Sequence, residues 1–503
     1  MSDRPASVAE PADASGIPPA RNGTRTVGVF LGIAGAVFVS RLPFLGPGYG
    51  LDADAWRIAL AGRLIASTGR YTVSRFPGYP LPEAVATLLS GAPAILPCAI
   101  TALLSALAAS FLALLARRSG ASLADAATIA AAFALSPVVF VQSTGGMDYL
   151  WAVAFLLAAW YAAARGHPLA SGLLGGCAIA CRATSILPLA PVVVLLARDE
   201  ASSAAAGRAG FAIRRTAVFA GAAAAVSFAA FAPSLARYGN GSASWSESVR
   251  PGFLQALRMA TAGVWGLVGT LAFIGVLLAP AAGRWFVFRA RAASGRPATT
   301  PDAATRLAWV AAAALVGLVF VILPLEPGYL IPAIPFLLLA ASAKLPATSL
   351  RLLTAALALS CLLGVEDSRP GTGPLLADHT ARLAERDRIA RILLSAEDLP
   401  PGSLVVVGPR LLPKIKMSLP LTSTLAGETS PFVLRGAVGG TPATNASPAV
   451  LKGVTWTAFL DEDGLRKHRA AGGALYFTEG AREANRRRMG LDFPPPEGVP
   501  IER

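Results

Sequence analysis

The sequence predicts an all-α polytopic membrane protein that ends in a small external α/β domain. Hydrophobic residues make up 54% of the 503 residues and charged residues only 15%, and the mean hydropathy is +0.56. These values lie outside the usual range of soluble globular proteins. Apolar runs of about 15 to 25 residues, long enough to cross a bilayer, recur from Thr26 to Val365. From Glu366 onward the sequence is mixed in polarity, which indicates a soluble domain.

The basic residues set the expected orientation. The net charge is +15, but the arginines cluster in short loops between the apolar runs, where they mark the cytoplasmic side rather than a nucleic-acid site. This pattern gives about eleven transmembrane crossings, a cytoplasmic N-terminus and an external C-terminus. The Ala-, Gly- and Arg-rich, Lys-poor composition indicates a bacterium, so we expect the bacterial inner membrane.

Composition divides the chain into three parts. Residues 1–25 are polar and Pro-rich and predict a disordered cytoplasmic tail. Residues 26–365 form the predicted transmembrane domain, which contains a long external loop at 45–93. Residues 366–503 form the predicted external, periplasmic α/β domain, and we expect its Pro-rich end to be disordered.

Hydrophobic periodicity places the individual elements. Apolar runs are expected to span the membrane at residues 26–44, 94–116, 124–142, 149–164, 169–197, 216–234, 259–280, 307–324, 329–343 and 349–365. In the first external loop, residues 54–67 and 81–90 fit helices that lie in the membrane interface. In the C-terminal domain we expect a helix at 380–395 and strands at 404–407, 455–460 and 474–478.

The run 169–197 is too long for one crossing. As a single helix it would measure about 43 Å, against a bilayer core of about 30 Å. It would also place the arginines that follow it outside, against the orientation rule. A break at 181–185 gives two short crossings, and the external tip of this hairpin then carries Arg182. A charged residue inside an apolar run is a functional candidate that needs an anionic partner.

The first external loop carries candidates for group-transfer chemistry. No nucleotide pool exists outside the membrane, so an activated group must arrive there on a lipid phosphate. Such a transfer needs a carboxylate that deprotonates the acceptor hydroxyl and cations that stabilise the departing phosphate. Asp52 or Asp54 could be the base, and Arg57, Arg75 and Arg182 could be phosphate clamps.

Each of these residues also has a structural interpretation. Asp52 and Asp54 precede an apolar helical pattern, where an aspartate caps a helix or lies in its first turn. The run 75–80, which includes Tyr79, could be a rigid turn with an aromatic residue at the membrane interface. Asp148, in the next external turn, could be a helix cap, and Glu326 could be an ordinary loop charge.

A metal centre built from cysteine or histidine ligands is not expected. Cys177 and Cys181 lie one helical turn apart, but neither a histidine nor a further cysteine lies nearby in the sequence to complete a site. Buried, unreactive cysteines explain this pair better. The chain also contains only 3 histidines, which argues against His-rich metal catalysis.

The order of these motifs resembles the GT-C superfamily of membrane glycosyltransferases, such as the protein O-mannosyltransferases and lipid A aminoarabinose transferases. The resemblance covers about residues 26–345. The motifs that carry it follow one another along the chain: Asp52 to Asp54, Gly69 to Tyr71, Pro77 to Pro80, Asp148, Gly172 to Arg182 and Glu326 to Pro335.

The resemblance implies a role for several residues. An aspartate early in the first external loop is the superfamily's catalytic base, and this role maps to Asp52 or Asp54, with Asp54 preferred. The second acidic residue maps to Asp148, and Arg182 would contact the donor phosphate. Tyr329 maps to the tyrosine that precedes a Pro-rich span, although a Pro-Gly pair here replaces the basic residue before it. An adjacent Asp-Glu pair is also lacking in the first loop, so the protein-mannosylating branch is not specifically indicated.

We therefore expect a glycosyltransferase that moves one sugar from a polyprenyl-phosphate donor to an acceptor hydroxyl of a glycan, lipid or protein on the external face. Arg75 and Arg182 would neutralise the leaving group, so no obligatory cofactor is expected, and a role for a divalent metal is left open. Two alternatives remain: a transporter or flippase of lipid-linked precursors, and a non-catalytic membrane scaffold whose external domain binds the cell wall.

Overall fold

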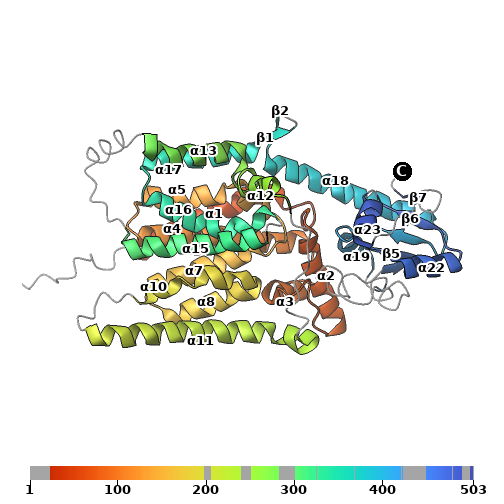
Figure 1. The fold of residues 1–503 in the computed structure, drawn as a ribbon, viewed down its shortest axis with the longest axis horizontal. Coiled ribbons are helices and arrows are strands. Elements are labelled where there is room, and N and C mark those ends of the chain that lie inside the picture. Colours follow the sequence, from red (N-terminus) through yellow and green to blue (C-terminus); the bar gives the residue numbers. More distant parts are fainter. Residues whose placement is uncertain are drawn as a thin grey trace, which may run out of the picture.

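The computed structural model describes residues 23–197, 205–239, 251–282, 301–323, 326–366, 369–420, 422, 449–478, 480–489 and 499–501. Long helices lie side by side in a bundle, and a small sheet with its own helices lies beyond one end of it (Figure 1). Most of the predicted tail 1–25, most of the loop 281–306 and most of the Pro-rich C-terminal end lie outside the described residues. The helices of the bundle are α1 (Gly23–Arg41), α4 (Ile95–Arg118), α5 (Leu123–Ala134), α6 (Pro137–Gln142), α7 (Tyr149–Ala164), α8 (Pro168–Cys181), α9 (Ile186–Leu189), α10 (Val192–Leu196), α11 (Ala205–Tyr238), α13 (Ala262–Ala282), α15 (Ala303–Ile322), α16 (Ile334–Ser342) and α17 (Ala347–Leu362).

The bundle has the composition and lengths of a multi-span membrane protein. Within the described ranges, four helices are long and apolar enough to cross a membrane, or five if the bent pair α12 (Phe253–Ala260) and α13 counts as one span. Five shorter apolar helices accompany them. The helical, polytopic class is therefore confirmed, while the count of about eleven crossings stays a prediction.

Several predicted spans are interrupted where proline or glycine occurs. The run 124–142 divides into α5 and α6 because Pro137 lacks an amide hydrogen and Ser136 before it adopts an extended conformation. The run 259–280 bends by 66° between α12 and α13. The segment at 329–343 begins as the 3-10 helix η4 (Pro327–Ala333), which contains Pro332, and becomes α-helical only at α16.

The break at 181–185 occurs where the sequence predicts it. Helix α8 ends at Cys181, Arg182 is extended, and the chain continues through the short 3-10 helix η2 (Ala183–Ser185) into α9 and α10. The segment after the break packs against α8. Its Leu189 side chain lies 3.3 Å from the position that a Cβ at Gly175 of α8 would take. The indole nitrogen of Trp160 donates to the carbonyl oxygen of Pro188 at 3.1 Å and ties this segment to α7.

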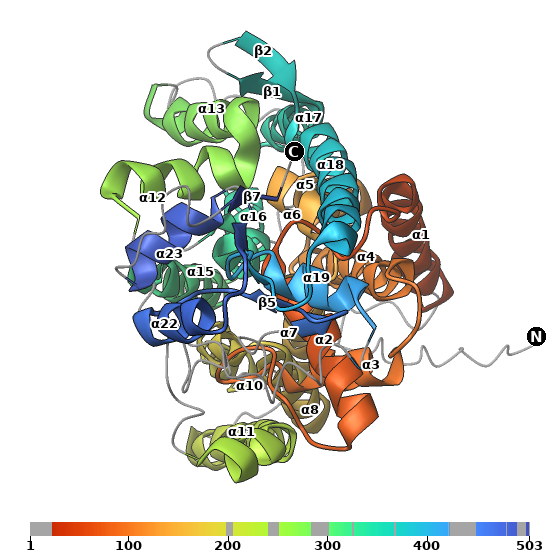
Figure 2. The same ribbon diagram turned by 90° about the vertical axis from the view of Figure 1, so that its right-hand side faces the viewer.

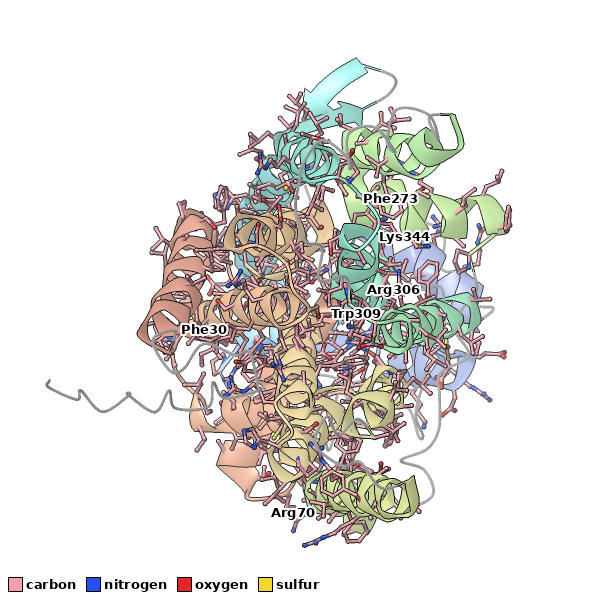
Figure 3. The ribbon with its side chains drawn as sticks, turned by 90° about the vertical axis from the view of Figure 1, so that its left-hand side faces the viewer. Phe30, Arg70, Phe273, Arg306, Trp309 and Lys344 are labelled. Carbon is pink, nitrogen blue, oxygen red and sulfur yellow. The ribbon has the colours of Figure 1, made fainter. Side chains whose placement is uncertain are left out.

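Small residues allow close packing inside the bundle. A Cβ at Gly172 of α8 would lie only 2.4 Å from the backbone oxygen of Phe219 in α11, so the two helices touch through their backbones. Trp309 of α15 is only 2% exposed and lies near the middle of the bundle when it is viewed along the helices (Figure 3). The core is thus formed mainly by alanine-lined helix contacts with a few large aromatic side chains between them.

The first external loop folds into two helices at the end of the bundle. Helices α2 (Ala53–Thr68) and α3 (Pro80–Leu88) agree with the predicted interfacial helices 54–67 and 81–90. Helix α2 lies across the bundle end, between the bundle and the C-terminal sheet (Figure 1). A short 3-10 helix η1 (Leu42–Phe44) connects α1 to this loop.

The C-terminal unit contains a five-stranded mixed sheet. Its order is β4-β5-β3-β6-β7, with β3 parallel to both β5 and β6, β7 parallel to β6, and only β4 antiparallel. The strands predicted at 404–407, 455–460 and 474–478 correspond to β3, β5 and β6, each somewhat shorter. The elements are β3 (Leu404–Val406), β4 (Ala449–Leu451), β5 (Val454–Thr457), β6 (Leu475–Phe477), β7 (Val499–Pro500), α19 (Leu412–Ser418), α22 (Glu462–Ala470) and α23 (Ala481–Met489).

Helix α18 (Pro374–Ser395) connects the bundle to this sheet and contains the predicted helix 380–395. It follows a hairpin of β1 (Leu363–Glu366) and β2 (Arg369–Thr372), and leads through the 3-10 helix η5 (Ala396–Asp398) into β3. Viewed from the sheet end, α19 lies over α2, the helix of the first loop (Figure 2). The C-terminal unit therefore reaches the loop that carries the predicted site.

Candidate active site

The two aspartates of the first loop have different roles in α2. Asp52 is the N-cap, with extended backbone angles and an Oδ1 atom that accepts a hydrogen bond of 2.9 Å from the amide of Asp54. Asp54 lies in the first turn and is 8% exposed. The capping interpretation is thus correct for Asp52, and the carboxylate of Asp54 forms ion pairs instead.

Two arginines bind the Asp54 carboxylate. Arg57, one turn further along α2, donates from Nη1 to Oδ1 at 2.6 Å, and Arg75 donates from Nη1 to Oδ2. The Nη2 of Arg57 donates at 3.1 Å to the carbonyl oxygen of Pro409 in the C-terminal unit. Both terminal nitrogens of Arg57 are therefore engaged, so this side chain is placed to orient Asp54. Arg75 is the more open of the two, with 20% of its side chain exposed.

A buried carboxylate fixes the loop that carries Arg75. Glu83 of α3 is 0% exposed, and its Oε1 accepts hydrogen bonds of 2.6 Å from both the amide and the hydroxyl of Ser74. Its Oε2 accepts a hydrogen bond of 2.5 Å from the Tyr71 hydroxyl. Burial raises the pKa of Glu83 above its ordinary value, and these hydrogen bonds oppose that rise. Glu83 thereby holds the backbone immediately before Arg75.

Tyr79 lies between two guanidinium groups, that of Arg75 in the first loop and that of Arg182 at the break after α8. Its hydroxyl accepts a hydrogen bond of 2.6 Å from Nε of Arg75, and burial raises the pKa of Tyr79 to about 12, so the phenol is neutral at neutral pH. The guanidinium carbons of Arg75 and Arg182 lie 4.8 and 5.7 Å from the centre of its ring. One aromatic ring thus brings together two of the three predicted phosphate ligands, Arg75 and Arg182.

Asp148 is the anionic partner that Arg182 needs. Its Oδ2 lies 2.7 Å from Nη1 of Arg182, and the two side chains are 1% and 4% exposed. Asp148 occupies the N-cap position of α7 but makes no capping hydrogen bond with its side chain. The interpretation of Asp148 as only a helix cap is therefore wrong.

Two further tyrosines complete the surroundings of Arg182. Its guanidinium carbon lies 3.8 Å from the ring centre of Tyr149 and 4.9 Å from that of Tyr329, within the range of cation–π attraction. The Tyr149 hydroxyl donates to Oε1 of Glu326. A Cβ at Gly328 would lie 2.5 Å from the Tyr149 ring, so a glycine is required for this close approach.

Glu326 belongs to the same network. Burial raises its pKa well above the ordinary value, and the charge of Asp52, together with a hydrogen bond to it, raises the pKa further. Glu326 therefore holds its proton more tightly than a solvated glutamate does. The interpretation of Glu326 as an ordinary loop charge is wrong.

The nine residues that the sequence singles out form one connected set at the end of the bundle that faces the C-terminal unit. Contacts lead from Asp52 to Glu326, through Tyr149 to Arg182, and through Tyr79 to Arg75 and Asp54. Sequence reasoning assigned no role to Tyr149 or Glu83. Tyr149 directly follows Asp148, which was the available signal, whereas Glu83 shows its role only once the loop is folded.

This arrangement can bind an anion and accept a proton. Two guanidiniums flank one ring, and a carboxylate lies against each of them, which suits stabilisation of a phosphate next to a base. In the described part of the chain, no group of three or more His, Cys, Asp or Glu side chains is placed to hold a metal ion. The four cysteines are unpaired thiols, and Cys98, Cys181 and Cys361 are buried.

Comparison with known proteins finds similarity in structure. No family model matches the sequence, and no curated protein matches it. The solved structure of ArnT from Cupriavidus metallidurans bound to undecaprenyl phosphate is 17% identical, with a TM-score of 0.48 over 90% of this chain and 88% of that chain. The archaeal oligosaccharyltransferase AglB from Archaeoglobus fulgidus, in complex with an inhibitory peptide and a dolichol-phosphate, is 12% identical. Its TM-score is 0.41, over 79% of this chain and 64% of that chain.

Both proteins are members of the GT-C superfamily, which the motif order of this sequence also resembles. The same ArnT without ligand gives 17% identity and a TM-score of 0.44. At this level of similarity the roles of the site residues rest on their own geometry.

Proposed function

We propose that this protein is a membrane glycosyltransferase that moves one sugar from a polyprenyl-phosphate donor to an acceptor hydroxyl on the external face. The proposal rests on two ion pairs that lie around the Tyr79 ring. Arg75 pairs with Asp54, and Arg182 pairs with Asp148. Two cations within reach of one ring suit the single phosphate of such a donor. The carboxylate of Asp54 can take the proton of the acceptor hydroxyl.

The reaction is a single displacement at the anomeric carbon. The acceptor oxygen attacks this carbon while its proton passes to the Asp54 carboxylate, and the bond from the anomeric carbon to the phosphate oxygen breaks. The bonding electrons leave with the polyprenyl phosphate, and the attack from the opposite side inverts the anomeric configuration. Arg57 holds Asp54 in place through its 2.6 Å contact, so that the base points toward the acceptor.

The leaving phosphate gains negative charge as this bond breaks. Arg75 and Arg182 compensate that charge, and the neutral Tyr79 hydroxyl orients Arg75. Two guanidiniums are sufficient for a monophosphate, so the proposal needs no obligatory cofactor. The donor prenyl chain would lie among the lipid-facing helices beside this site.

The topology belongs to the same proposal. We place the site, the loop 45–93 and the C-terminal unit on the external side of the bacterial inner membrane, and the loop 281–306 with the N-terminus in the cytoplasm. With these sides assigned, the apolar runs of the sequence give about eleven crossings. The Arg-rich sequence of 281–306 supports this orientation.

The test compares Asp54→Asn with Asp52→Asn in a strain that lacks the protein. Asparagine keeps the size of aspartate and tolerates the first turn, but it removes the charge that Arg57 and Arg75 bind, so the amount of folded protein in the membrane is measured for each variant and the product is expressed per folded protein. Glycan analysis of the cell envelope should show product loss by at least about a hundredfold for Asp54→Asn, the low end for a lost general base.

Asp52→Asn is the matched comparison, because asparagine caps a helix about as well as aspartate. We expect it to be the milder change. Full complementation of the strain by both variants would refute the proposal, as would a strain whose glycans do not depend on the wild-type protein.

A further inference from the structure

An arginine of the first loop reaches into the C-terminal unit. Arg63 of α2 donates from Nη1 to the carbonyl oxygens of Lys416 and Met417 at 3.2 and 3.3 Å, and from Nη2 to that of Leu419 at 2.9 Å. These three carbonyls lie at the C-terminal end of α19, where backbone oxygens have no partners within the helix and carry partial negative charge. Arg63 therefore caps a helix of the C-terminal unit from the membrane bundle.

A second arginine makes a contact in the opposite direction, from the C-terminal part of the chain to the bundle. Arg382 of α18 donates from Nη1 to the carbonyl oxygen of Thr144 at 2.9 Å, and from Nη2 to that of Val141 at 3.2 Å and to the Thr144 hydroxyl at 3.1 Å. Its side chain is 4% exposed and forms an ion pair of 2.6 Å with Asp378. These acceptors end α6 and begin the turn that carries Asp148.

The two contacts hold the segments that carry Asp54 and Asp148, the two carboxylates that pair with Arg75 and Arg182. Arg63 holds α2, which carries Asp54, and Arg382 holds the turn that leads to Asp148. A third contact is more direct, because Arg57 binds Asp54 with one terminal nitrogen and the Pro409 carbonyl oxygen with the other. Pro409 lies between β3 and α19 of the C-terminal unit.

Packing fixes α2 closely against α3, where a Cβ at Gly62 would lie 2.4 Å from the Ala86 backbone, but it does not fix every face of α2. On the face of α2 opposite Asp54 lies a cavity of about 630 Å³, whose lining includes Trp56, Ala59 and Arg63 together with Met417 of the C-terminal unit. A helix with such a space behind it has fewer side-chain contacts to resist a shift than one packed on both faces. Its position then depends more strongly on the polar contacts at its surface.

We propose that the C-terminal unit is a clamp that sets the positions of the two carboxylates, with Arg63 and Arg382 as its positioning residues. The inference rests on the proposed function, because it assigns the unit a part in the transfer reaction. All the acceptors across this boundary except the Thr144 hydroxyl are backbone oxygens, so the clamp depends mainly on the fold of α19 and of the turn after α6. Arginine suits this role because its planar fork reaches several acceptors at once.

The experiment uses the full chain in lipid nanodiscs, with Arg63→Ala, Arg63→Lys and Arg382→Ala. Arg70→Ala and Arg386→Ala are the controls. Arg70 is an exposed residue of the same loop, at the edge of the molecule in Figure 3, and the Arg386 side chain is 65% exposed on the same helix as Arg382. Three quantities are measured: amide hydrogen exchange, the stoichiometry of binding of undecaprenyl phosphate as the carrier probe, and sugar transfer to the envelope by the same variants in the strain that lacks the protein, which is divided by that stoichiometry and called transfer per bound carrier.

In Arg63→Ala, exchange in α2 and α19 should rise by at least about tenfold while exchange in α4 stays unchanged, since one charge-assisted hydrogen bond is worth about that factor. Carrier stoichiometry should stay the same, and transfer per bound carrier should fall by at least about tenfold. Arg63→Lys should lie between the wild type and Arg63→Ala. Arg382→Ala should raise exchange at residues 141–148, and both controls should match the wild type.

Three outcomes would overturn the clamp. Unchanged exchange in α2 would show that Arg63 does not hold it. A rise in exchange with unchanged transfer per bound carrier would show that the contact is structural and not positional. A parallel fall in stoichiometry and total transfer leaves transfer per bound carrier unchanged, and this would show that Arg63 maintains folded protein without positioning the carboxylates. If the wild type neither binds the carrier nor transfers a sugar, the proposed function fails, and the exchange measurement still decides whether the unit holds α2.

Discussion

Removal of Arg182 should destabilise the site more than removal of its partner Asp148. The pair is almost fully buried, with a 2.7 Å contact and side chains 4% and 1% exposed. Deletion of one member of a buried ion pair leaves the other charge without compensation and costs about 3–5 kcal/mol. The two deletions differ, however, in what remains around the surviving charge.

In Asp148→Ala the arginine keeps two aromatic neighbours, Tyr149 at 3.8 Å and Tyr329 at 4.9 Å from its guanidinium carbon. A desolvated cation–π contact is worth about 2 kcal/mol, so this variant should lose roughly that much less stability than Arg182→Ala. In Arg182→Ala the Asp148 carboxylate keeps only the electrostatic attraction of Arg75, a cation that is already paired with Asp54. The double variant removes both charges and should be more stable than Arg182→Ala alone.

Thermal unfolding in a single detergent gives the order, with Arg165→Ala, an exposed arginine at the end of α7, as the control. The expected order of midpoints is wild type and control highest, then Asp148→Ala, with Arg182→Ala lowest and the double variant above it. If Asp148→Ala unfolds at a lower temperature than Arg182→Ala, the tyrosines do not stabilise the cation. If the double variant is no more stable than Arg182→Ala, the two charges are not coupled in the way the contact distance implies.

Two further predictions concern protonation and topology. Burial and the charge of Asp52 raise the pKa of Glu326, so wild-type stability should fall as pH rises above the ordinary glutamate value, because the unfolded chain releases this proton first. The thermal midpoint of Glu326→Gln should therefore rise relative to that of the wild type between about pH 5 and 8. A difference between the two midpoints that does not change with pH would contradict the raised pKa of Glu326. For topology, a cysteine at Arg466, whose side chain is 74% exposed, should react with an impermeant thiol reagent in intact cells that lack the native cysteines. A cysteine at position 291 should not react, and the reverse pattern would invalidate the orientation; Ser403, at 1% exposure, is too buried for this assay.

Periodicity and length were sufficient to predict the helices around the site. The apolar pattern of 54–67 became α2, and the conflict between helix length and charge at 169–197 located the break before Arg182. The sequence also indicated that Arg182 needs an acidic partner. It did not identify that partner, because Asp148 lies 34 positions away and only the packing of α7 against α8 brings them together.

Contacts to backbone atoms could not be predicted in this way. The three acceptors of Arg63 are carbonyl oxygens, and so are two of the acceptors of Arg382. Every residue carries such an oxygen, so no residue type marks these contacts in the sequence. The interruption of 124–142 at Ser136 is different, since Pro137 was visible, but proline also occurs within membrane helices such as α11. The role of Glu83 emerges only when Ser74 and Tyr71 fold onto it.

A structure of the protein with undecaprenyl phosphate bound would test the central claim most directly. We expect phosphate oxygens within about 3 Å of the guanidinium nitrogens of both Arg75 and Arg182, with the Tyr79 ring beside them and the Asp54 carboxylate facing the side from which an acceptor enters. A phosphate bound at the opposite end of the bundle, or in contact with neither arginine, would contradict the assignment of this site to sugar transfer from a lipid carrier.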